Sequence, residues 1–306
     1  MSRWISCDPK SVQLKEHARL LANSASTVLI RGEGGAGKDL LASMLHYLGP
    51  HAGEPLVKID CASLPAELVE SELFGSESDE APFGIVGRKR GRLEIAGCGT
   101  VVLDEVAALS MPVQAKLLHV IEQKRLPRNG GRTIAVEARI IALTSVALEN
   151  AVSRRSFRED LYYRLNVIAL EAPALRERAR DIRPLAIHLL QQLAEIHRKP
   201  HLAWSEAALV ALERYRFPGN VRELRSIIEQ AVIGSSAPEI MLEDLPAHVR
   251  PASNGLNGAP KSLEELERQH IVDILEYTRG KKTRAAAILG ISRKTLLEKR
   301  KRYGLG

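Results

Sequence analysis

The stretch Thr27-Val28-Leu29-Ile30-Arg31-Gly32-Glu33-Gly34-Gly35-Ala36-Gly37-Lys38-Asp39-Leu40-Leu41 decides how this chain folds. An apolar run at 27–30 precedes a glycine loop and an apolar segment at 40–45 follows it, so the order strand, loop, helix is predicted. This spacing is typical of a phosphate-binding loop, because glycines let backbone N–H groups point at phosphate oxygens and Lys38 adds a charge for the β- and γ-phosphates. We predict that ATP binds through Gly32, Glu33, Gly34, Gly35, Ala36, Gly37, Lys38 and Asp39.

Polar side chains at the ends of two further apolar runs complete the predicted site. Asp104 and Glu105 follow the run 100–103, where Asp104 is placed to hold hydrated Mg²⁺ and Glu105 to orient and deprotonate the attacking water. Asp39 stands where the loop pattern usually has Ser or Thr, so it reaches the ion as a carboxylate or through water. Thr144, in the run 138–145, is the candidate γ-phosphate sensor, and a plain strand-end cap is the alternative.

Composition narrows the class of protein. The chain of 306 residues is long enough for two or three domains. Only 4% of its residues are aromatic, so it has few rings on which the bases of single-stranded nucleic acid could stack. Cys7, Cys61 and Cys98 lie far apart, which argues against a disulfide framework or a zinc site and favours the cytoplasm. No apolar stretch is long enough for a signal peptide or a membrane span, so no membrane partner is expected. A net charge of +7 favours a polyanionic partner.

The pattern of apolar residues divides the chain into parts. Strands and helices alternate in the first part, which predicts an α/β domain with three layers around a parallel sheet. After residue 173 strands disappear and helices are predicted at about 181–197, 205–215 and 220–234. The segment 75–92 has no period and is interpreted as an exposed insertion. The predicted parts are 1–170 (α/β), 171–250 (helical), 251–260 (linker) and 261–306 (all-α).

The last part has the pattern of a helix-turn-helix. Helical stretches at 263–277, 283–289 and 292–303 have very short connections, with a tight turn at Gly290 and a predicted N-cap at Ser292. The basic excess of the chain lies here and indicates double-stranded DNA as partner, although a basic helix can also be only a solvated face. Base edges are predicted to meet Ser292, Arg293, Lys294 and Thr295. Phosphates are predicted to be held by Lys281, Lys282, Arg300 and Arg302.

The motifs in this order resemble bacterial enhancer-binding proteins, the AAA+ ATPases that activate sigma-54 RNA polymerase. The matching stretches are 32–38 (GEGGAGK), 60–65 (DCASLP), 72–75 (ELFG), 91–94 (GRLE), 102–105 (VLDE), 157–167 (FREDLYYRLNV) and 218–224 (PGNVREL). The tail 282–296 is similar to the Fis-type DNA-binding domain of the same family. The resemblance covers residues from about 8 to 306 and implies an AAA+ P-loop fold with an α-helical lid.

The resemblance also assigns roles that position alone leaves open. Arg158 and Arg164 lie in a basic segment, where arginines are either solvated charges or fingers that reach the γ-phosphate of a neighbouring subunit. The resemblance implies that both are fingers and that Arg222 is the sensor in the lid. It further implies hexameric rings, ATP and Mg²⁺ as cofactors, and RNA polymerase or an intact enhancer-binding relative as a further partner.

Three departures from the family pattern bear on function. The Gly-Ala-Phe-Thr-Gly-Ala loop that touches the sigma factor is replaced at 76–87 by SESDEAPFGIVG, in which Pro82 restricts the chain before the single aromatic Phe83. Asp60 stands where the family usually has Asn, and beside Glu105 it would repel that carboxylate. Ser145 also stands where the family usually has Asn. No receiver or ligand-sensing domain is expected ahead of the phosphate loop.

The sequence therefore predicts a DNA-binding transcriptional regulator with an ATP-binding and ATP-hydrolysing AAA+ domain. The changed loop predicts that direct contact with sigma-54 is lost. Such a protein would act as a repressor, as a co-regulator in mixed rings with an intact relative, or with the housekeeping polymerase. One alternative is a regulator that uses ATP only for assembly, and another is an AAA+ replication or repair motor.

Overall fold

The computed structural model describes residues 4–76, 89–127, 133–235, 237–250, 263–278 and 282–303. The chain divides into two compact units, Met1–Arg250 and Pro251–Gly306. No helix among the described residues is long and apolar enough to cross a bilayer.

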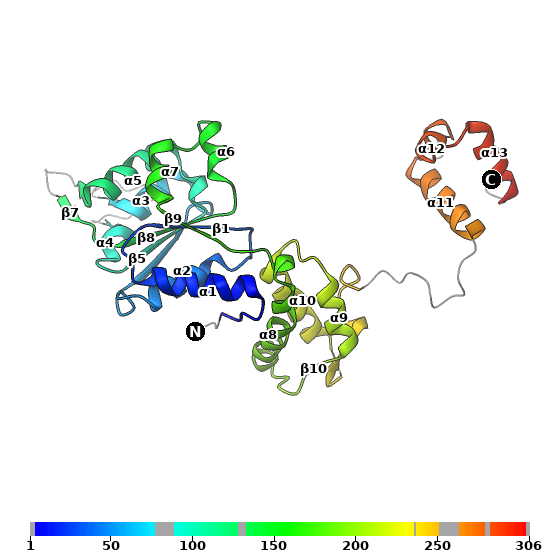
Figure 1. The fold of residues 1–306 in the computed structure, drawn as a ribbon, viewed down its shortest axis with the longest axis horizontal. Coiled ribbons are helices and arrows are strands. Elements are labelled where there is room, and N and C mark those ends of the chain that lie inside the picture. The colour runs from blue at the N-terminus through cyan, green and yellow to red at the C-terminus, as the bar shows by residue number, and fades with distance from the viewer. Residues whose placement is uncertain are drawn as a thin grey trace. The chain divides into compact units, whose positions relative to one another are not determined.

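A five-stranded parallel sheet forms the centre of the first unit, with the strand order β2-β5-β8-β1-β9 (Figure 1). The strands are β1 (Val28–Arg31), β2 (Leu56–Asp60), β5 (Thr100–Asp104), β8 (Arg139–Thr144) and β9 (Ile168–Glu171). Because the strands are parallel, their carboxyl ends meet at one edge of the sheet, where ligands bind in open α/β folds.

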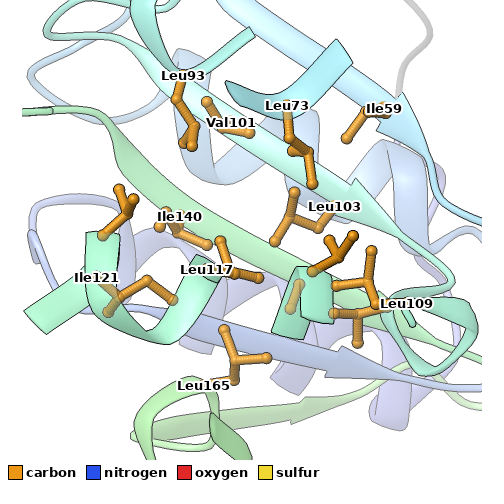
Figure 2. Packing of buried hydrophobic residues seen from close by; sticks show 14 of the residues in the cluster. Ile59, Leu73, Leu93, Val101, Leu103, Leu109, Leu117, Ile121, Ile140 and Leu165 are labelled. Atoms are coloured by element: carbon orange, nitrogen blue, oxygen red, sulfur yellow. The ribbon is translucent and has the colours of Figure 1, made fainter. Parts of the chain in front are cut away.

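Helices cover both faces of this sheet, as a three-layer α/β fold requires (Figure 1). One face packs on α1 (Pro9–Ala22) and α2 (Lys38–Tyr47). The other packs on α3 (Ala66–Phe74), α4 (Arg92–Ile95), α5 (Met111–Gln123) and α7 (Glu159–Leu165), with α6 (Leu148–Ser153) leading into α7. Along β5 the side chains alternate: Val101 and Leu103 join the second core, which Figure 2 shows, and Val102 joins the first.

The lid follows β9 and has its own core. Its main helices are α8 (Ile182–Ile196), α9 (Glu206–Arg214) and α10 (Asn220–Gly234), which bury one cluster around the fully buried Phe217. Short 3₁₀ turns of the lid are η3 (Leu175–Glu177), η4 (Ala179–Asp181) and η5 (Leu242–Asp244). A further such turn, η1 (Val106–Ala108), follows β5 in the α/β part. The fold class predicted from the sequence is confirmed.

Several short strands differ from the sequence-based expectations. Strand β9 was not predicted and supplies an edge of the sheet next to β1. The ends of the predicted insertion pair as β3 (Gly75–Ser76) with β4 (Lys89–Arg90), and β6 (Arg125–Pro127) pairs with β7 (Thr133–Ala135). The expectation that strands disappear after residue 173 was wrong, because β10 (Ala203–Trp204) pairs with β11 (Glu239–Ile240) in the lid. Such short pairings carry too few residues to show a period.

The second unit is a small helical domain. Its helices are α11 (Leu263–Tyr277), α12 (Lys282–Ile288) and α13 (Arg293–Arg302). Ile271, Ala285, Ala286 and Leu296 form its buried core. Gly290 takes a φ of +66° between α12 and α13, and the Ser292 hydroxyl accepts a hydrogen bond from the Thr295 amide (3.0 Å), so the predicted turn and N-cap are both present.

Candidate nucleotide site and DNA-reading helices

The phosphate loop lies between the end of β1 and the start of α2, and the backbone requires glycine at positions 35 and 37. Gly35 has a φ of +76°, and a Cβ there would lie 2.5 Å from the Gly219 carbonyl oxygen of the lid. Gly37 has a φ of +104° and immediately precedes α2, which begins at Lys38. The first turn of α2 therefore presents its unpaired amides to the loop, which is the arrangement that binds phosphate.

Lys38 is buried at the centre of the loop. Its Nζ donates to the carbonyl oxygens of Gly32 (2.8 Å) and Glu33 (3.3 Å) and lies 3.4 Å from Glu105 Oε1. The ammonium is thus held over the loop by two carbonyls and one carboxylate, in the position from which it can turn to a bound phosphate.

Glu105 follows β5 in a left-handed conformation with a φ of +51°. Its Oε2 accepts hydrogen bonds from both the amide (3.0 Å) and the hydroxyl (2.7 Å) of Ser145, which directly follows β8. Its Oε1 faces Lys38. The carboxylate is therefore held next to the phosphate loop by residues of two neighbouring segments.

Asp60, the acid that was expected to repel Glu105, turns its carboxylate to its own loop. Its Oδ1 instead accepts from the amides of Ala62 (2.9 Å) and Ser63 (3.2 Å) in the turn after β2. Two backbone donors compensate this carboxylate locally, which explains how an acid is accommodated where the family usually has Asn.

Asp104 and Asp39 share one cation. Lys58, on β2, lies 2.7 Å from Asp104 Oδ2 and is also hydrogen-bonded to Asp39 Oδ1. Burial alone would lower the pKa of Lys58, but the hydrogen bonds to Asp104 and Asp39 outweigh it and raise that pKa. Two carboxylates that converge on one positive charge beside a phosphate loop form a donor set that Mg²⁺ prefers. Among the described residues no group of three or more His, Cys, Asp or Glu side chains forms a closed metal site.

Several acidic side chains lie close together at the carboxyl ends of β2 and β5, and their charges affect the pKa of the neighbouring Cys61. Burial, followed by the charges of Asp60, Asp104 and Glu105, raises the pKa of the Cys61 thiol to about 12. A site with this much negative charge requires compensating cations from the protein or the solvent.

The phosphate loop is bonded to the lid as well as to the sheet. The Glu33 carboxylate accepts two hydrogen bonds from Arg176 (2.8 and 2.6 Å) and one from Asn220 Nδ2 (3.1 Å), which together lower the pKa of Glu33 to about 2. The amide of Val221 donates to the Gly35 carbonyl (3.0 Å). The Glu33 side chain, predicted to contact the nucleotide, therefore points to the lid and leaves the backbone of the loop to face a ligand.

A pocket of about 1040 Å³ opens beside this junction. The predicted residues among those that line it are Gly34, Gly35, Gly37, Lys38, Asp39, Asp104, Glu105 and Arg222. Arg222 extends from α10 over the loop, since a Cβ on Gly34 would lie 3.8 Å from its Nη1. Arg225 lines the same pocket from the next turn of the helix and was not singled out from the sequence.

One buried residue of the lid, Asp181, holds the segment that precedes α1 and the first turn of that helix. Asp181, fully buried, accepts from the amides of Cys7 (2.6 Å) and Asp8 (2.7 Å) and from the Ser11 hydroxyl. The N-terminal segment is thus fixed to the lid by one carboxylate.

Arg178 makes a similar link to the phosphate loop. It donates to the Ala36 carbonyl (2.5 Å), and its guanidinium carbon lies 5.5 Å from the centre of the Trp4 ring. Burial lowers the pKa of Arg178. The lid therefore begins with a direct hydrogen bond to the phosphate loop.

Comparison with known protein families identifies this arrangement. Residues 4–171 match the sigma-54 interaction domain, 176–261 the AAA+ ATPase lid domain and 262–303 the Fis family of bacterial regulatory proteins. The chain belongs to the sigma-54 enhancer-binding family.

Relatives of this family align with nearly the whole chain. Regulatory protein AtoC of Escherichia coli (strain K12) is 39% identical over 308 residues, which cover 97% of this chain and 67% of AtoC. Transcriptional regulatory protein ZraR of Salmonella typhimurium is 41% identical over 298 residues, which cover 96% of this chain and 67% of ZraR. The structure of NtrX from Brucella abortus in complex with ATP is similar with a TM-score of 0.73 and 31% identity, and the match covers 100% of this chain and 70% of NtrX.

In this enhancer-binding protein, three further residues that were predicted to act on the nucleotide do not line this pocket. They are Thr144, Arg158 and Arg164. The Thr144 hydroxyl donates to the Val146 carbonyl (2.9 Å) in the turn after β8, so it is engaged locally. Arg158 makes two hydrogen bonds to Asp160 (3.0 and 2.7 Å), and Arg164 is exposed on α7. A hollow of about 470 Å³ is lined by Arg158, Glu159, Asp160 and Tyr163. Arg158 is thus bonded within its own chain, and Arg164 lies on the surface.

The Fis-type unit displays its cations unevenly. Arg293 and Lys294 are exposed at the first turn of α13, and Lys282 is exposed at the start of α12. Arg302 instead pairs with Glu264 of α11. The hydroxyls of Ser292 and Thr295 lie 2.8 Å apart in the helix cap, and Lys281 lies outside the described residues. Within the described part of this helix-turn-helix, Arg293 and Lys294 are therefore exposed cations at the start of α13.

Three functional contacts were missed or only partly recognised in the sequence. Lys58 stands at an alternating position of the strand that ends in Asp60, and a cation there was a usable signal. Ser145 was noted only as a departure from the family. Asp181 carried no signal, because its partners lie about 170 residues earlier in the chain. The loop at 76–87 lies, apart from Ser76, outside the described residues.

Proposed function

We propose that this protein is a DNA-binding transcriptional regulator that binds ATP with Mg²⁺ and hydrolyses it to ADP and phosphate. The observation that carries the proposal is the phosphate loop, with Lys38 and Glu105 facing each other 3.4 Å apart in a pocket that residues of the lid also line. Because the proposed partner is bacterial DNA, we propose that the protein acts in the cytoplasm. The alternative function, a regulator that uses ATP only for assembly, has to be distinguished from this one by experiment.

Each residue of the site has a proposed role. Lys38 and the loop amides bind the β- and γ-phosphates, and Arg222 contacts them from the lid. Glu105 takes the proton of the attacking water, and Thr144 senses the γ-phosphate. Asp104, with Asp39 close by, holds Mg²⁺ through water, and the ion supplies neutralisation of charge on the phosphates.

Nucleotide binding is tested with a nonhydrolysable ATP analogue. Lys38→Ala should lose binding because the buried ammonium is the charge closest to the phosphates. Lys116→Ala is the matched control, since Lys116 pairs with Glu70 outside the pocket. Equal binding by both variants and the wild type would show that the phosphate loop is assigned wrongly.

Turnover and ring assembly are tested together by mixing two variants. Glu105→Ala and Arg158→Ala should each lose phosphate release, the first by losing the base and the second by losing the finger. If Arg158 acts on a neighbouring subunit, an equal mixture regains about a quarter of wild-type turnover, because about one interface in four then has both groups. A wild type that binds ATP without releasing phosphate supports the assembly-only alternative, and a mixture that stays inactive contradicts fingers in trans.

DNA recognition by α12 and α13 is tested with two single variants. Arg293→Ala should relax preference at one base pair by ~1–3 kcal/mol, because its exposed guanidinium is proposed to read a base edge. Lys282→Ala should weaken binding to all sequences alike and flatten the salt dependence, because it is proposed to hold a phosphate. Equal effects of both variants on specific and random DNA would refute these assignments.

The last part of the proposal concerns how this protein acts on RNA polymerase. We infer from the changed loop at 76–87 that sigma-54 is not contacted directly, so the protein acts as a repressor, in mixed rings, or with the housekeeping polymerase. The assay is in vitro transcription with purified components. ATP-dependent open-complex formation by sigma-54 polymerase with this protein alone, abolished by Phe83→Ala, would contradict this inference.

A further inference from the structure

The neighbours of Glu105 are set by strand order. Strand β5 lies between β2 and β8, so a residue that follows β5 has the end of β2 on one side and the end of β8 on the other. These ends carry Asp60 and Ser145 respectively. Only one of the two side chains can donate a hydrogen bond to a carboxylate, because the side chain of an ionised Asp is an acceptor alone.

The donors all lie on the β8 side and on the phosphate loop. Ser145 gives its amide and its hydroxyl to Oε2 of Glu105, while Asp60 turns to the amides of its own loop. The other oxygen, Oε1, faces Lys38, which is also bonded to two carbonyls of the phosphate loop. A phosphate that draws Lys38 away would free Oε1 and leave Oε2 held by Ser145.

We propose that Ser145 is the positioning residue that aims Glu105 at the attacking water, with its amide and with a side-chain donor that the carboxylate of Asp60 cannot supply. The proposal rests on the proposed ATPase activity. In the step concerned, Oε1 of Glu105 accepts a proton from water as the water oxygen bonds to the γ-phosphorus. The bond from that phosphorus to the bridging oxygen breaks, and its electron pair leaves on ADP.

Amide hydrogen exchange without nucleotide tests the contact independently of turnover. The Ser145 amide should exchange about tenfold faster in Glu105→Ala than in the wild type, because it loses its acceptor. The same amide should exchange at the wild-type rate in Asp60→Ala. No acceleration in Glu105→Ala, or equal acceleration in Asp60→Ala, would overturn the proposal.

Steady-state kinetics of the full chain test the consequence. Ser145→Ala keeps the amide and loses the hydroxyl, so kcat should fall about tenfold while KM for ATP stays within about twofold. Ser145→Thr should recover most of the lost kcat because it restores a hydroxyl. An unchanged kcat in Ser145→Ala, or a loss that Ser145→Thr does not recover, refutes the positioning role while the ATPase stands. A wild type without phosphate release refutes the ATPase and this role together, whereas the exchange experiment still reports whether the contact exists.

Discussion

Removing the buried carboxylate of Asp181 should destabilise the first unit more than any surface change near the nucleotide pocket. The side chain is fully buried, and its oxygens accept from the amides of Cys7 (2.6 Å) and Asp8 (2.7 Å) and from the Ser11 hydroxyl. In Asp181→Ala these donors lose their acceptor. An unsatisfied buried donor costs ~1–3 kcal/mol, and the Cys7 amide is only partly buried, so the two amides and the hydroxyl together give a loss near the lower end of their sum, roughly 3–5 kcal/mol in the free energy of unfolding.

The matched variant is Asp181→Asn, which removes the charge and keeps an acceptor. Its carbonyl oxygen can still accept from both amides, and the Ser11 hydroxyl can rotate to accept from the new NH₂ group. We therefore expect a loss of about 1 kcal/mol, close to the value of a single hydrogen bond.

Urea unfolding of the full chain, followed by tryptophan fluorescence, measures both variants. Trp4 and Trp204 are the two tryptophans of the sequence, and both belong to the first unit, so the signal reports that unit. A loss below about 1 kcal/mol in Asp181→Ala would refute the reasoning from unsatisfied donors. Equal losses in both variants would show that the charge, and not the acceptor, stabilises the segment.

Two further predictions concern the junction between the phosphate loop and the lid. The depressed pKa of Glu33 means that its bonds to Arg176 stabilise the protein above about pH 4.5 and are lost as the pH falls towards 2. Glu33→Gln should therefore cost ~0.5–1 kcal/mol at pH 6, a small value because both side chains are partly exposed, and the difference from the wild type should vanish near pH 2 in unfolding curves. Gly35→Ala should cost roughly 1–3 kcal/mol, because its Cβ would lie 2.5 Å from the Gly219 oxygen at a φ of +76°. Gly34→Ala has no atom within 3.4 Å of its Cβ and should change stability by less than about 0.5 kcal/mol, so equal losses in the two variants would contradict the contact with the lid.

The sequence by itself determined the elements whose signals are local. The spacing from Gly32 to Lys38, the apolar run ahead of it and the helix behind it predicted β1, the loop and α2, because backbone freedom and periodicity are properties of neighbouring residues. The same holds for the turn at Gly290 and the cap at Ser292. The acidic end of β5 was found in this way too.

Only the tertiary structure decided which of these groups meet. Strand order placed Ser145 and Asp60 on opposite sides of Glu105, and no pattern within either segment shows that order. Asp181 accepts hydrogen bonds from the start of α1 and the segment before it, and Glu33 accepts from Arg176 in the lid. A hydrogen bond is selected by distance and direction in space, and residues more than a hundred positions apart leave no local trace of it. The chain sequence therefore fixes what each segment can form, whereas packing fixes which carboxylate is held, by which donor, beside the phosphate loop.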